Sequence, residues 1–495
     1  MVSKTKVALS VLIASGLVSA GLFVFWPSND IGSAFSEPLN VPVEASSTLE
    51  SSTRSFDLDL QSGETKFGSA GSVSTWGING AYLGPTLRVN KGEEVLINVA
   101  NTLDEDTTMH WHGLHAPAEM DGGPHQTIAS GDTWSPQWLI DQPASTNWYH
   151  PHLHGESAAQ VKKGLVGMFI VDDPAEAPLG LPSTYGLDDI PVIFHDAPDE
   201  VSRGNAAQEA LRSVFQRGRP PAVTLVNGGR ETAFEVTSQA VRLRLLNATI
   251  DDHLEVSFSD SRTFKVIASE GGLLPKPQTL ESLSLSPGER YEIVVEFEPN
   301  DATRLSLIKT NSDNQKADNA EELVEFRSSN DLVDRGSVPA TLSTARPVEV
   351  PSETSTRNFD MSDVAINGME MDMMRIDQVV TAGSTEIWSI RNLDQRTLHN
   401  FHVHGVSFTV LDIDGSKPPA YMATKKDTVL IPPGAEVNLL VEFPTVSSDG
   451  WPYMFHCHFL RHEGRGMMGQ YLVVEEGASL DPADHMISSM AGHNH

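Results

Sequence analysis

The stretch GEEVLINVANTLDEDTTMHWHG, Gly92–Gly113, and the stretch GSTEIWSIRNLDQRTLHNFHVHG, Gly383–Gly405, repeat one pattern in a chain of 495 residues. Each begins with a run that predicts a β-strand, continues through an Asn and a loop, and ends in His-x-His-Gly. A middle copy, VRLRLLNATIDDHLEVSF from Val241, keeps the strand and the Asn but has no His-x-His. The repeat predicts three related domains, of which the middle one lacks the histidines.

Short β-branched runs between Gly, Pro, Asn and Asp turns fill much of the remaining chain and are typical of antiparallel β-sandwiches. A second repeat, PGERYEIVVEFEP from Pro287 and PGAEVNLLVEFPT from Pro433, is a turn followed by a strand. Boundaries are expected where Pro is frequent, at 172–186 and 336–357. We predict an all-β chain with sandwich domains at 56–175, 186–340 and 356–476, a linker at 31–55 and a tail at 477–495. Glu44–Ser55, rich in Ser, Thr and Glu, is expected to be a flexible spacer.

The N-terminal region and the charge limit where the protein works and what it binds. After Lys4 and Lys6, an uncharged apolar run at residues 7–26 predicts a helix long enough to span a bilayer. It is either a membrane anchor or part of a signal peptide within residues 1–30, and both predict a location outside the cytoplasmic membrane. With 66 acidic residues against 34 Lys and Arg, the formal net charge is -32, which argues against nucleic acid as a partner.

Four compact motifs hold ten of the 18 histidines: HWH (His110, His112), HPH (His150, His152), HNFHVH (His399, His402, His404) and HCHFLRH (His456, His458, His462). Alternate residues of a strand share a face, so each His-x-His directs two imidazoles into one space. For the same reason Cys457, the only cysteine, is expected to point away from the two histidines that flank it. With one thiol there is no disulfide framework, so the cysteine needs another role.

The ligand types around the cysteine indicate copper. A thiolate with two imidazoles and a weak thioether suits a blue-copper electron-transfer centre. Cys457, His462 and Met467 follow one another at intervals of five residues, and His399 approaches from another strand. Zinc also accepts Cys and His, but it is redox-inactive and would leave the other histidines without a role.

The four motifs resemble, in order and spacing, the copper-binding motifs of the three-domain multicopper oxidases, over the body of the chain from about Phe56 to Glu476. The resemblance implies Greek-key cupredoxin domains and four copper ions per chain: one type 1, one type 2 and two type 3. His399, Cys457, His462 and Met467 match the type 1 ligands, and His110 and His402 match the type 2 ligands. The type 3 ligands would be His112, His150, His152, His404, His456 and His458.

The reaction implied by the resemblance is one-electron oxidation of a donor at the type 1 copper, electron transfer along Cys457, and four-electron reduction of dioxygen to water at the trinuclear cluster. Because that reduction consumes protons, acidic groups are expected nearby. Asp121, in EMDGGP, matches a carboxylate that the family keeps beside the cluster; the alternative is a turn-forming Asp before two glycines. Glu463 resembles a proton-relay carboxylate, with an exposed loop Glu as the alternative. His154 matches no ligand.

Methionines and acidic residues near the type 1 ligands bear on the identity of the electron donor. The segment FDMSDVAINGMEMDMMRID contains Met361, Met369, Met371, Met373 and Met374, and the alternation at 369, 371 and 373 predicts one strand face. Thioethers favour Cu(I), although Met is also a common core filler. DQRTLH before His399 offers Asp394 but no methionine, a departure from the cuprous oxidases.

These residues lead to three hypotheses for the function. We expect a monomeric oxidase of Cu(I) or another low-valent metal with a role in copper tolerance, with phenols as secondary donors. The alternative is a laccase that acts on phenols and aromatic amines. A non-catalytic cupredoxin-repeat protein of the cell envelope is a third hypothesis, and it predicts missing ligands. The His- and Met-containing tail, from His485 to His495, either collects copper or is a disordered terminus.

Overall fold

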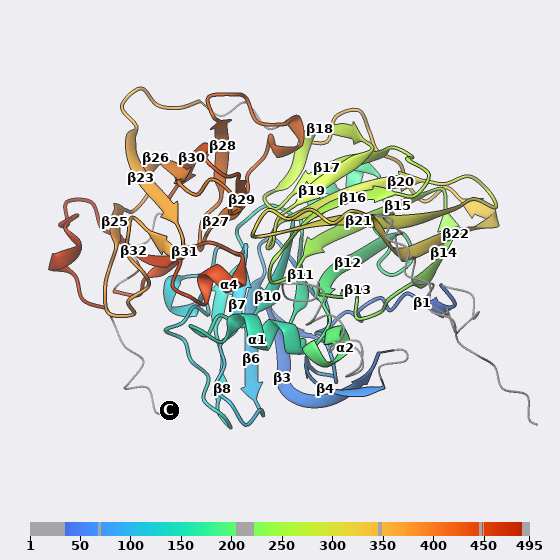
Figure 1. Ribbon diagram of the computed structural model, residues 1–495, viewed down its shortest axis with the longest axis horizontal. Helices are drawn as coiled ribbons and strands as arrows, with labels where there is room; N and C mark the ends of the chain where they lie inside the picture. The colour runs from blue at the N-terminus through green and yellow to red at the C-terminus, as the bar shows by residue number, and fades with distance from the viewer. Residues whose placement is uncertain are drawn as a thin grey trace, which may run out of the picture. The chain divides into compact units, whose positions relative to one another are not determined.

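The computed structural model describes residues 35–67, 71–203, 222–344, 349–444, 448 and 450–487. Strands predominate in these ranges and form six sheets, two for each of three successive parts of the chain (Figure 1). The predicted all-β fold of three sandwich domains is confirmed. The apolar run at 7–26 and the end of the tail lie outside the described residues, so the anchor or signal stays a prediction. Within the described ranges, no helix has the length and apolar character needed to cross a membrane.

The first domain pairs a sheet of order β2-β3-β6-β8 with a sheet of order β5-β11-β10-β7; β4 joins β3 and β9 joins β6. Its strands are β2 (Thr48–Glu50), β3 (Thr53–Lys66), β4 (Ser72–Ile78), β5 (Leu87–Asn90), β6 (Glu94–Asn101), β7 (His110–His112), β8 (Thr133–Trp134), β9 (Gln137–Leu139), β10 (Ser145–His150) and β11 (Gly167–Asp172). An apolar core that includes Trp111 fills the space between the sheets.

The middle domain pairs sheets of order β1-β14-β22-β21-β16-β19 and β13-β12-β15-β20-β17-β18, around a core that includes Tyr291. Its strands are β1 (Glu37–Pro38), β12 (Asp189–Asp196), β13 (Thr224–Val226), β14 (Thr232–Ser238), β15 (Ala240–Asn247), β16 (Asp252–Phe258), β17 (Phe264–Ser269), β18 (Gly272–Leu280), β19 (Ser282–Leu285), β20 (Arg290–Glu296), β21 (Ala302–Asn311) and β22 (Glu321–Val333).

The third domain, orange to red in Figure 1, pairs sheets of order β24-β23-β26-β30-β28 and β25-β32-β31-β27-β29 around a core that includes Trp388. Its strands are β23 (Ser355–Ser362), β24 (Ala365–Ile366), β25 (Gln378–Thr381), β26 (Thr385–Asn392), β27 (His399–Val403), β28 (Phe408–Ile413), β29 (Thr428–Ile431), β30 (Glu436–Glu442), β31 (Tyr453–His456) and β32 (Met468–Val474). The described helices are short: α1 (Ser157–Lys163), α2 (Asp199–Arg203) and α4 (Leu460–Glu463), with 3₁₀ turns at Ala118–Met120, Pro174–Leu179, Ala420–Met422 and Pro482–Asp484.

Two expectations from the sequence need correction. The sandwiches are not purely antiparallel, because each domain contains two parallel pairs of strands. These are β3–β6 and β5–β11 in the first domain, β12–β15 and β14–β22 in the middle domain, and β23–β26 and β25–β32 in the third. Parallel neighbours require crossover connections, which leave no local signal in the sequence. The predicted spacer Glu44–Ser55 is not a free linker, because it contains β2 and the start of β3, and β1 before it pairs with β14.

The repeated Asn closes the same loop in all three domains. Asn101, Asn247 and Asn392 end strands β6, β15 and β26. The side-chain N–H groups of each Asn donate to two backbone carbonyls, one of them 4–5 residues later in the chain and the other on a more distant strand or loop. The side-chain oxygen accepts from the backbone N–H two residues later. The Asn therefore fixes the loop that leads to the His-x-His motif in the outer domains.

Candidate metal centres

Strand register brings the histidine motifs together in pairs. In the first domain β10 runs antiparallel to β7, with His150 opposite His110. In the third domain β27 runs antiparallel to β31, with His402 opposite His456. The motifs that are distant in sequence are thus neighbours within one sheet of each domain.

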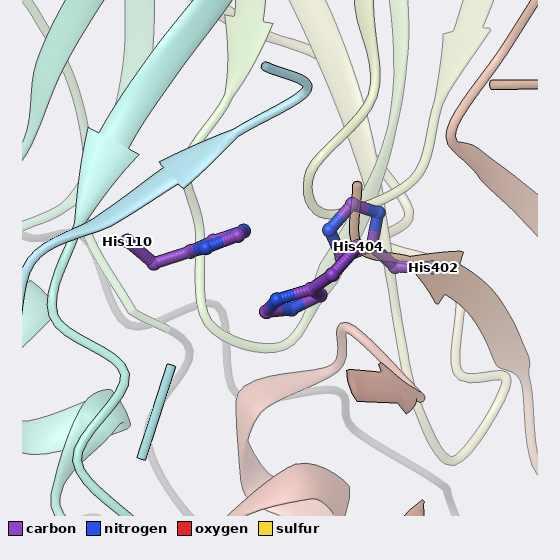
Figure 2. Close-up of side chains that lie close together, drawn as sticks. All are labelled: His110, His402 and His404. Atoms are coloured by element: carbon purple, nitrogen blue, oxygen red, sulfur yellow. The ribbon is translucent and has the colours of Figure 1, made fainter. Parts of the chain in front are cut away.

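The two pairs of strands meet in one group of eight buried histidines, which we call the eight-histidine cluster: His110, His112, His150, His152, His402, His404, His456 and His458. Across the two domains the His110 ring stacks on that of His404 with centroids 3.8 Å apart, and His112 stacks on His402 at 3.7 Å. Figure 2 shows His110 directed toward His402 and His404. Ligand atoms within 4.8 Å of one another occur in three overlapping trios: His110, His402 and His404; His110, His112 and His150; His152, His404 and His456.

Most rings of this cluster have one oriented nitrogen and one that faces the shared space. The Nδ1 atoms of His110, His150, His402 and His456 donate to the carbonyls of Asp121, Pro151, Asp427 and Cys457 at 2.8–3.1 Å. Within the described part of the chain, no hydrogen-bond partner is found for Nε2 of His110, His150 and His402, for Nδ1 of His112, or for either ring nitrogen of His458. Buried polar atoms without partners are rare, and imidazole nitrogens arranged in this way fit metal ions.

The cluster also favours the protonation state that a metal needs. Burial lowers the pKa of seven members, helped by repulsion from neighbouring histidines: His112, His150, His152, His402, His404, His456 and His458. Their imidazoles are therefore neutral at physiological pH. Neutral imidazole is the form that binds a metal ion.

A second group, which we call the thiol site, consists of His399, Cys457, His462 and Met467, all buried. The Cys457 Sγ lies 3.8 Å from His399 Nδ1 and 3.6 Å from His462 Nδ1, and the two imidazole nitrogens are 3.2 Å apart. Met467 is held beside them, since its N–H donates to His462 O and its carbonyl accepts from Cys457 N–H. Burial raises the pKa of the Cys457 thiol to about 12, so thiolate formation depends on a bound cation.

The two sites share one short piece of chain. His456 and His458 belong to the eight-histidine cluster, whereas Cys457 between them lies in the thiol site. The strand ends at His456, yet the alternation of directions continues through His458, as the sequence predicted. The main chain around Cys457 therefore connects the two sites covalently.

The two carboxyl groups that were predicted from the sequence are buried and lie against the eight-histidine cluster. Asp121 accepts from His404 Nδ1 at 2.7 Å and lies 3.4 Å from His110 Nδ1. Glu463, on α4, accepts from the Ser157 hydroxyl at 3.0 Å and lies 3.8 Å from His152 Nδ1. Its side chain is fully buried, so the alternative of an exposed loop glutamate is wrong, and burial raises its pKa to about 8.

Comparison with known proteins places this arrangement in a family. Three family models, each described as multicopper oxidase, match residues 59–176, 193–324 and 343–477. A multicopper oxidase, mco, of Staphylococcus epidermidis is 35% identical over 85% of this chain and 88% of its own. The chain belongs to the multicopper oxidase family. It is therefore an oxidoreductase that uses dioxygen, and copper is the metal that its ligand set implies.

Other relatives of this oxidase carry names that describe different functions. The cell division protein FtsP of Shigella dysenteriae is 34% identical over 81% of this chain and 86% of its own. A laccase-like multicopper oxidase, CueO, of Ochrobactrum sp. is 36% identical, with a TM-score of 0.75 over 88% of this chain and 100% of that one. A multicopper oxidase of Campylobacter jejuni described as a metallo-oxidase is 25% identical, with a TM-score of 0.75 over 89% and 96%.

The histidines outside the motifs have other surroundings in the oxidase. His154 is exposed. His115, His125 and His195 have hydrogen-bond partners in Ser407, Gln470 and Tyr82.

The methionine segment does not form the predicted strand face. Residues 370–377 contain no strand, and Met361 is a core residue of β23. The loop nevertheless runs beside the thiol site, because Met371 N–H donates to Gly466 O at 2.9 Å.

Sequence reasoning missed residues that hydrogen-bond to ring nitrogens of the cluster on the side away from the shared space. Asp427 accepts from His112 Nε2 at 3.1 Å, and the Thr428 hydroxyl lies 3.2 Å from the same atom. Arg290, fully buried, donates through both terminal nitrogens to the Asp427 carboxylate at 2.7 Å. In the sequence Asp427 follows two lysines, a pattern typical of a solvated turn, and only the pairing of β27 with β29 brings it to the histidines.

Proposed function

We propose that this oxidase holds four copper ions per chain, with a type 1 ion at the thiol site and a type 2 ion and a type 3 pair at the eight-histidine cluster. The type 1 ligands would be His399, Cys457, His462 and Met467, and His110 and His402 would hold the type 2 ion. His152, His404 and His456 form one trio for the type 3 pair. His112, His150 and His458 form the other, with ring centroids 4.9–5.7 Å apart. The domain limits 56–175, 186–340 and 356–476 belong to the same proposal.

When bound, the copper ions supply one-electron oxidation of the donor at the thiol site and four-electron reduction of dioxygen to water at the cluster. The protein residues hold and connect these sites. The imidazoles are kept neutral by burial, and the backbone carbonyls fix which nitrogen faces inward. Cys457 provides the covalent path for electrons to its neighbours His456 and His458.

Protons for water formation would come through Glu463, one of the buried carboxyl groups beside the cluster, whereas Asp121 would orient a ligand. Glu463, with a pKa of about 8, holds a proton at its carboxyl group at neutral pH and lies next to Ser157 and His152. Asp121 accepts from His404 and orients that ring. Their contacts with cluster histidines support the roles of proton donor for Glu463 and of ligand-orienting acceptor for Asp121.

Replacing Glu463 with Gln tests the proton donor. Gln keeps the shape but cannot release a proton, so we expect reoxidation of the reduced enzyme by dioxygen to slow by about 10²- to 10⁴-fold. The blue centre should still be reduced at the wild-type rate when an electron donor is added in the absence of dioxygen. Stopped-flow absorbance separates the two half-reactions, and Glu156→Gln, at an exposed position before α1, is the control. Equal reoxidation rates in both variants would exclude Glu463 as the donor.

For the electron donor, we propose Cu(I) or another low-valent metal ion, with copper tolerance as the biological role. One observation carries this proposal: the Asp394 carboxylate accepts from His399 Nε2 at 2.9 Å and is about one quarter exposed. A cation bound at Asp394 would be one hydrogen bond from a type 1 ligand. Asp363, whose N–H donates to Asp394, adds a second acidic residue nearby.

A laccase that oxidises phenols and aromatic amines is the second candidate. The absence of methionine from DQRTLH before His399 favours it, as does the similarity to the laccase-like Ochrobactrum enzyme. A non-catalytic envelope protein is disfavoured because every predicted ligand is present in one of the two sites.

Steady-state rates with Cu(I), Fe(II) and a phenol, on one copper-loaded preparation with and without excess Cu(II), distinguish the two candidates. We expect Asp394→Asn to lower kcat/KM for Cu(I) by about 10- to 100-fold, because the variant keeps a hydrogen-bonding group but loses the charge. The phenol rate should change by less than about threefold. Asp360→Asn, which removes a carboxylate paired with Arg391, serves as the control. Phenol oxidation that exceeds both metal rates and ignores added copper would overturn the metal-oxidase proposal.

A further inference from the structure

The turn Ser286–Arg290 of the middle domain lies next to the copper ligands, although that domain contributes none. It joins β19 to β20 and is buried throughout. Glu289 closes it, since its carboxylate accepts from Ser286 N–H at 2.6 Å and its own N–H donates to Ser286 O. Turns normally lie at the surface of a protein, so a fully buried Pro-Gly turn is unusual.

The start of the turn holds the segment between the two sites. The Asn400 side chain, on β27, donates to Pro287 O at 2.8 Å and to Ser286 Oγ at 3.2 Å. The Asn400 side-chain oxygen accepts from His458 N–H at 2.5 Å and lies 3.6 Å from Cys457 Sγ. Through one amide the turn thus fixes the main chain that joins the thiol site to the cluster.

The middle of the turn packs against two ligand rings. Gly288 has φ +87°, and a Cβ there would lie 3.0 Å from Cγ of His458 and 3.2 Å from Cε1 of His112. Those distances are shorter than ordinary van der Waals contacts, so a side chain would displace the rings. Glycine at this position lets the backbone touch both imidazoles.

The end of the turn reaches the remaining side of the cluster. Arg290 makes a bidentate pair with Asp427, whose carboxylate accepts from His112 Nε2 and whose carbonyl accepts from His402 Nδ1. Arg290 also donates to the carbonyl of Thr146 on β10 at 2.9 Å. Space for the guanidinium depends on Gly113, because a Cβ there would lie 2.3 Å from its nitrogen. A planar bidentate pair fixes orientation as well as charge.

We propose that the turn Ser286–Arg290 is a positioning element for the trinuclear copper site, with Gly288 and Arg290 as its positioning residues. The inference rests on the proposed copper assignment. It gives the copper-free middle domain a role in the reaction: the turn sets the direction of the His112, His402 and His458 rings from outside the two domains that carry them.

The internal repeat supplies a matched control for Gly288. Pro433 and Gly434 form the corresponding turn before β30, and Gly434 has φ +75°. Among the described residues, the atoms nearest to a Cβ at Gly434 belong to the Gln395 side chain, at 3.5 Å or more. Gly288→Ala and Gly434→Ala therefore impose a similar backbone strain, and only the first places an atom against ligand histidines.

The experiment compares these two variants as copper-loaded full-length protein. We expect both variants to lower Tm, Gly288→Ala by more because of its contact with the two rings, and only Gly288→Ala should weaken copper binding at the cluster, by about 10- to 100-fold in affinity. Competition with a chelator, followed by copper content and by the electron paramagnetic resonance signal of type 2 copper, measures that affinity. The blue absorption of the thiol site should remain in both.

Arg290→Lys and Arg244→Lys form a second pair, which keeps the test decisive if Gly288→Ala does not fold. Arg244 is also buried, pairs in bidentate fashion with Asp189 and donates to Thr146 Oγ1. In the described ranges the ion pairs of Asp189 are with Arg88 and Arg244, not with a histidine. We expect an altered type 2 signal only in Arg290→Lys. Equal affinities and signals within both pairs would overturn the inference. A wild-type chain without a type 2 signal would instead overturn the copper assignment itself.

Discussion

Replacing Cys457 with Ser will abolish the blue absorption and lower the oxidase rate by more than about 100-fold. Loss of a residue that merely supports a ligand already costs about 10- to 100-fold in metal affinity or activity, and here the thiolate ligand itself is lost. The hydroxyl of Ser is a poor ligand for copper and interrupts the path from the thiol site to His456 and His458. Visible absorption and oxygen uptake with Cu(I) and with a phenol measure the two effects.

The same variant tests whether the two sites are separate. The eight-histidine cluster does not use the thiol, so Cys457→Ser should keep the type 2 signal and the copper ions of the cluster. Ser is smaller and close in shape, and the buried site keeps its His399 and His462 rings, so the fold should persist. A blue colour that survives the substitution would contradict the type 1 assignment, and loss of all copper would contradict the separation of the sites.

Much of this arrangement could be predicted because it depends on local periodicity. The spacing of two in HWH and HCH, together with the pleat of a strand, places His456 and His458 on one side and Cys457 on the other. The repeated strand and Asn predict related domains, and the structure gives the Asn the same three hydrogen bonds in each. These features are encoded within about twenty residues of one another.

What could not be predicted depends on contacts between distant segments. Asp427 and Arg290 meet across 137 positions, and each alone has the sequence context of a surface residue. The PGER and PGAE turns look alike as sequence, yet Gly288 faces His458 whereas Gly434 faces Gln395. The parallel strand pairs and the pairing of β1 with β14 are equally non-local. Residues that support a metal site are therefore harder to find from sequence than its ligands.

Mild acid will unfold the copper-free protein, and bound copper will prevent it. Nine predicted ligand histidines have a pKa lowered chiefly by burial. A histidine with a lowered pKa binds fewer protons in the folded than in the unfolded chain once the pH falls below about 6.5. Its contribution to stability is therefore present above that pH and is lost as the pH falls, at about 1.4 kcal/mol per pH unit for each group.

The size of this effect follows from comparison with the total stability of a protein, which is about 5–15 kcal/mol. Several such histidines together would exhaust it within one or two pH units below 6.5. Glu463 acts in the opposite direction, because its raised pKa of about 8 favours the folded state at low pH, but it is a single group. Copper-bound imidazoles cannot take up protons, so the loaded protein should unfold at a lower pH.

Circular dichroism between pH 7.5 and 4, with and without copper, measures the two midpoints. His150→Gln removes one buried imidazole and should make the transition of the copper-free protein less steep, because fewer protons are taken up on unfolding. His154→Gln removes an exposed imidazole and should leave the steepness unchanged. Coinciding midpoints for the copper-free and loaded protein would mean that the clustered histidines do not resist protonation in the folded chain, and the argument that burial keeps them neutral for copper would fail.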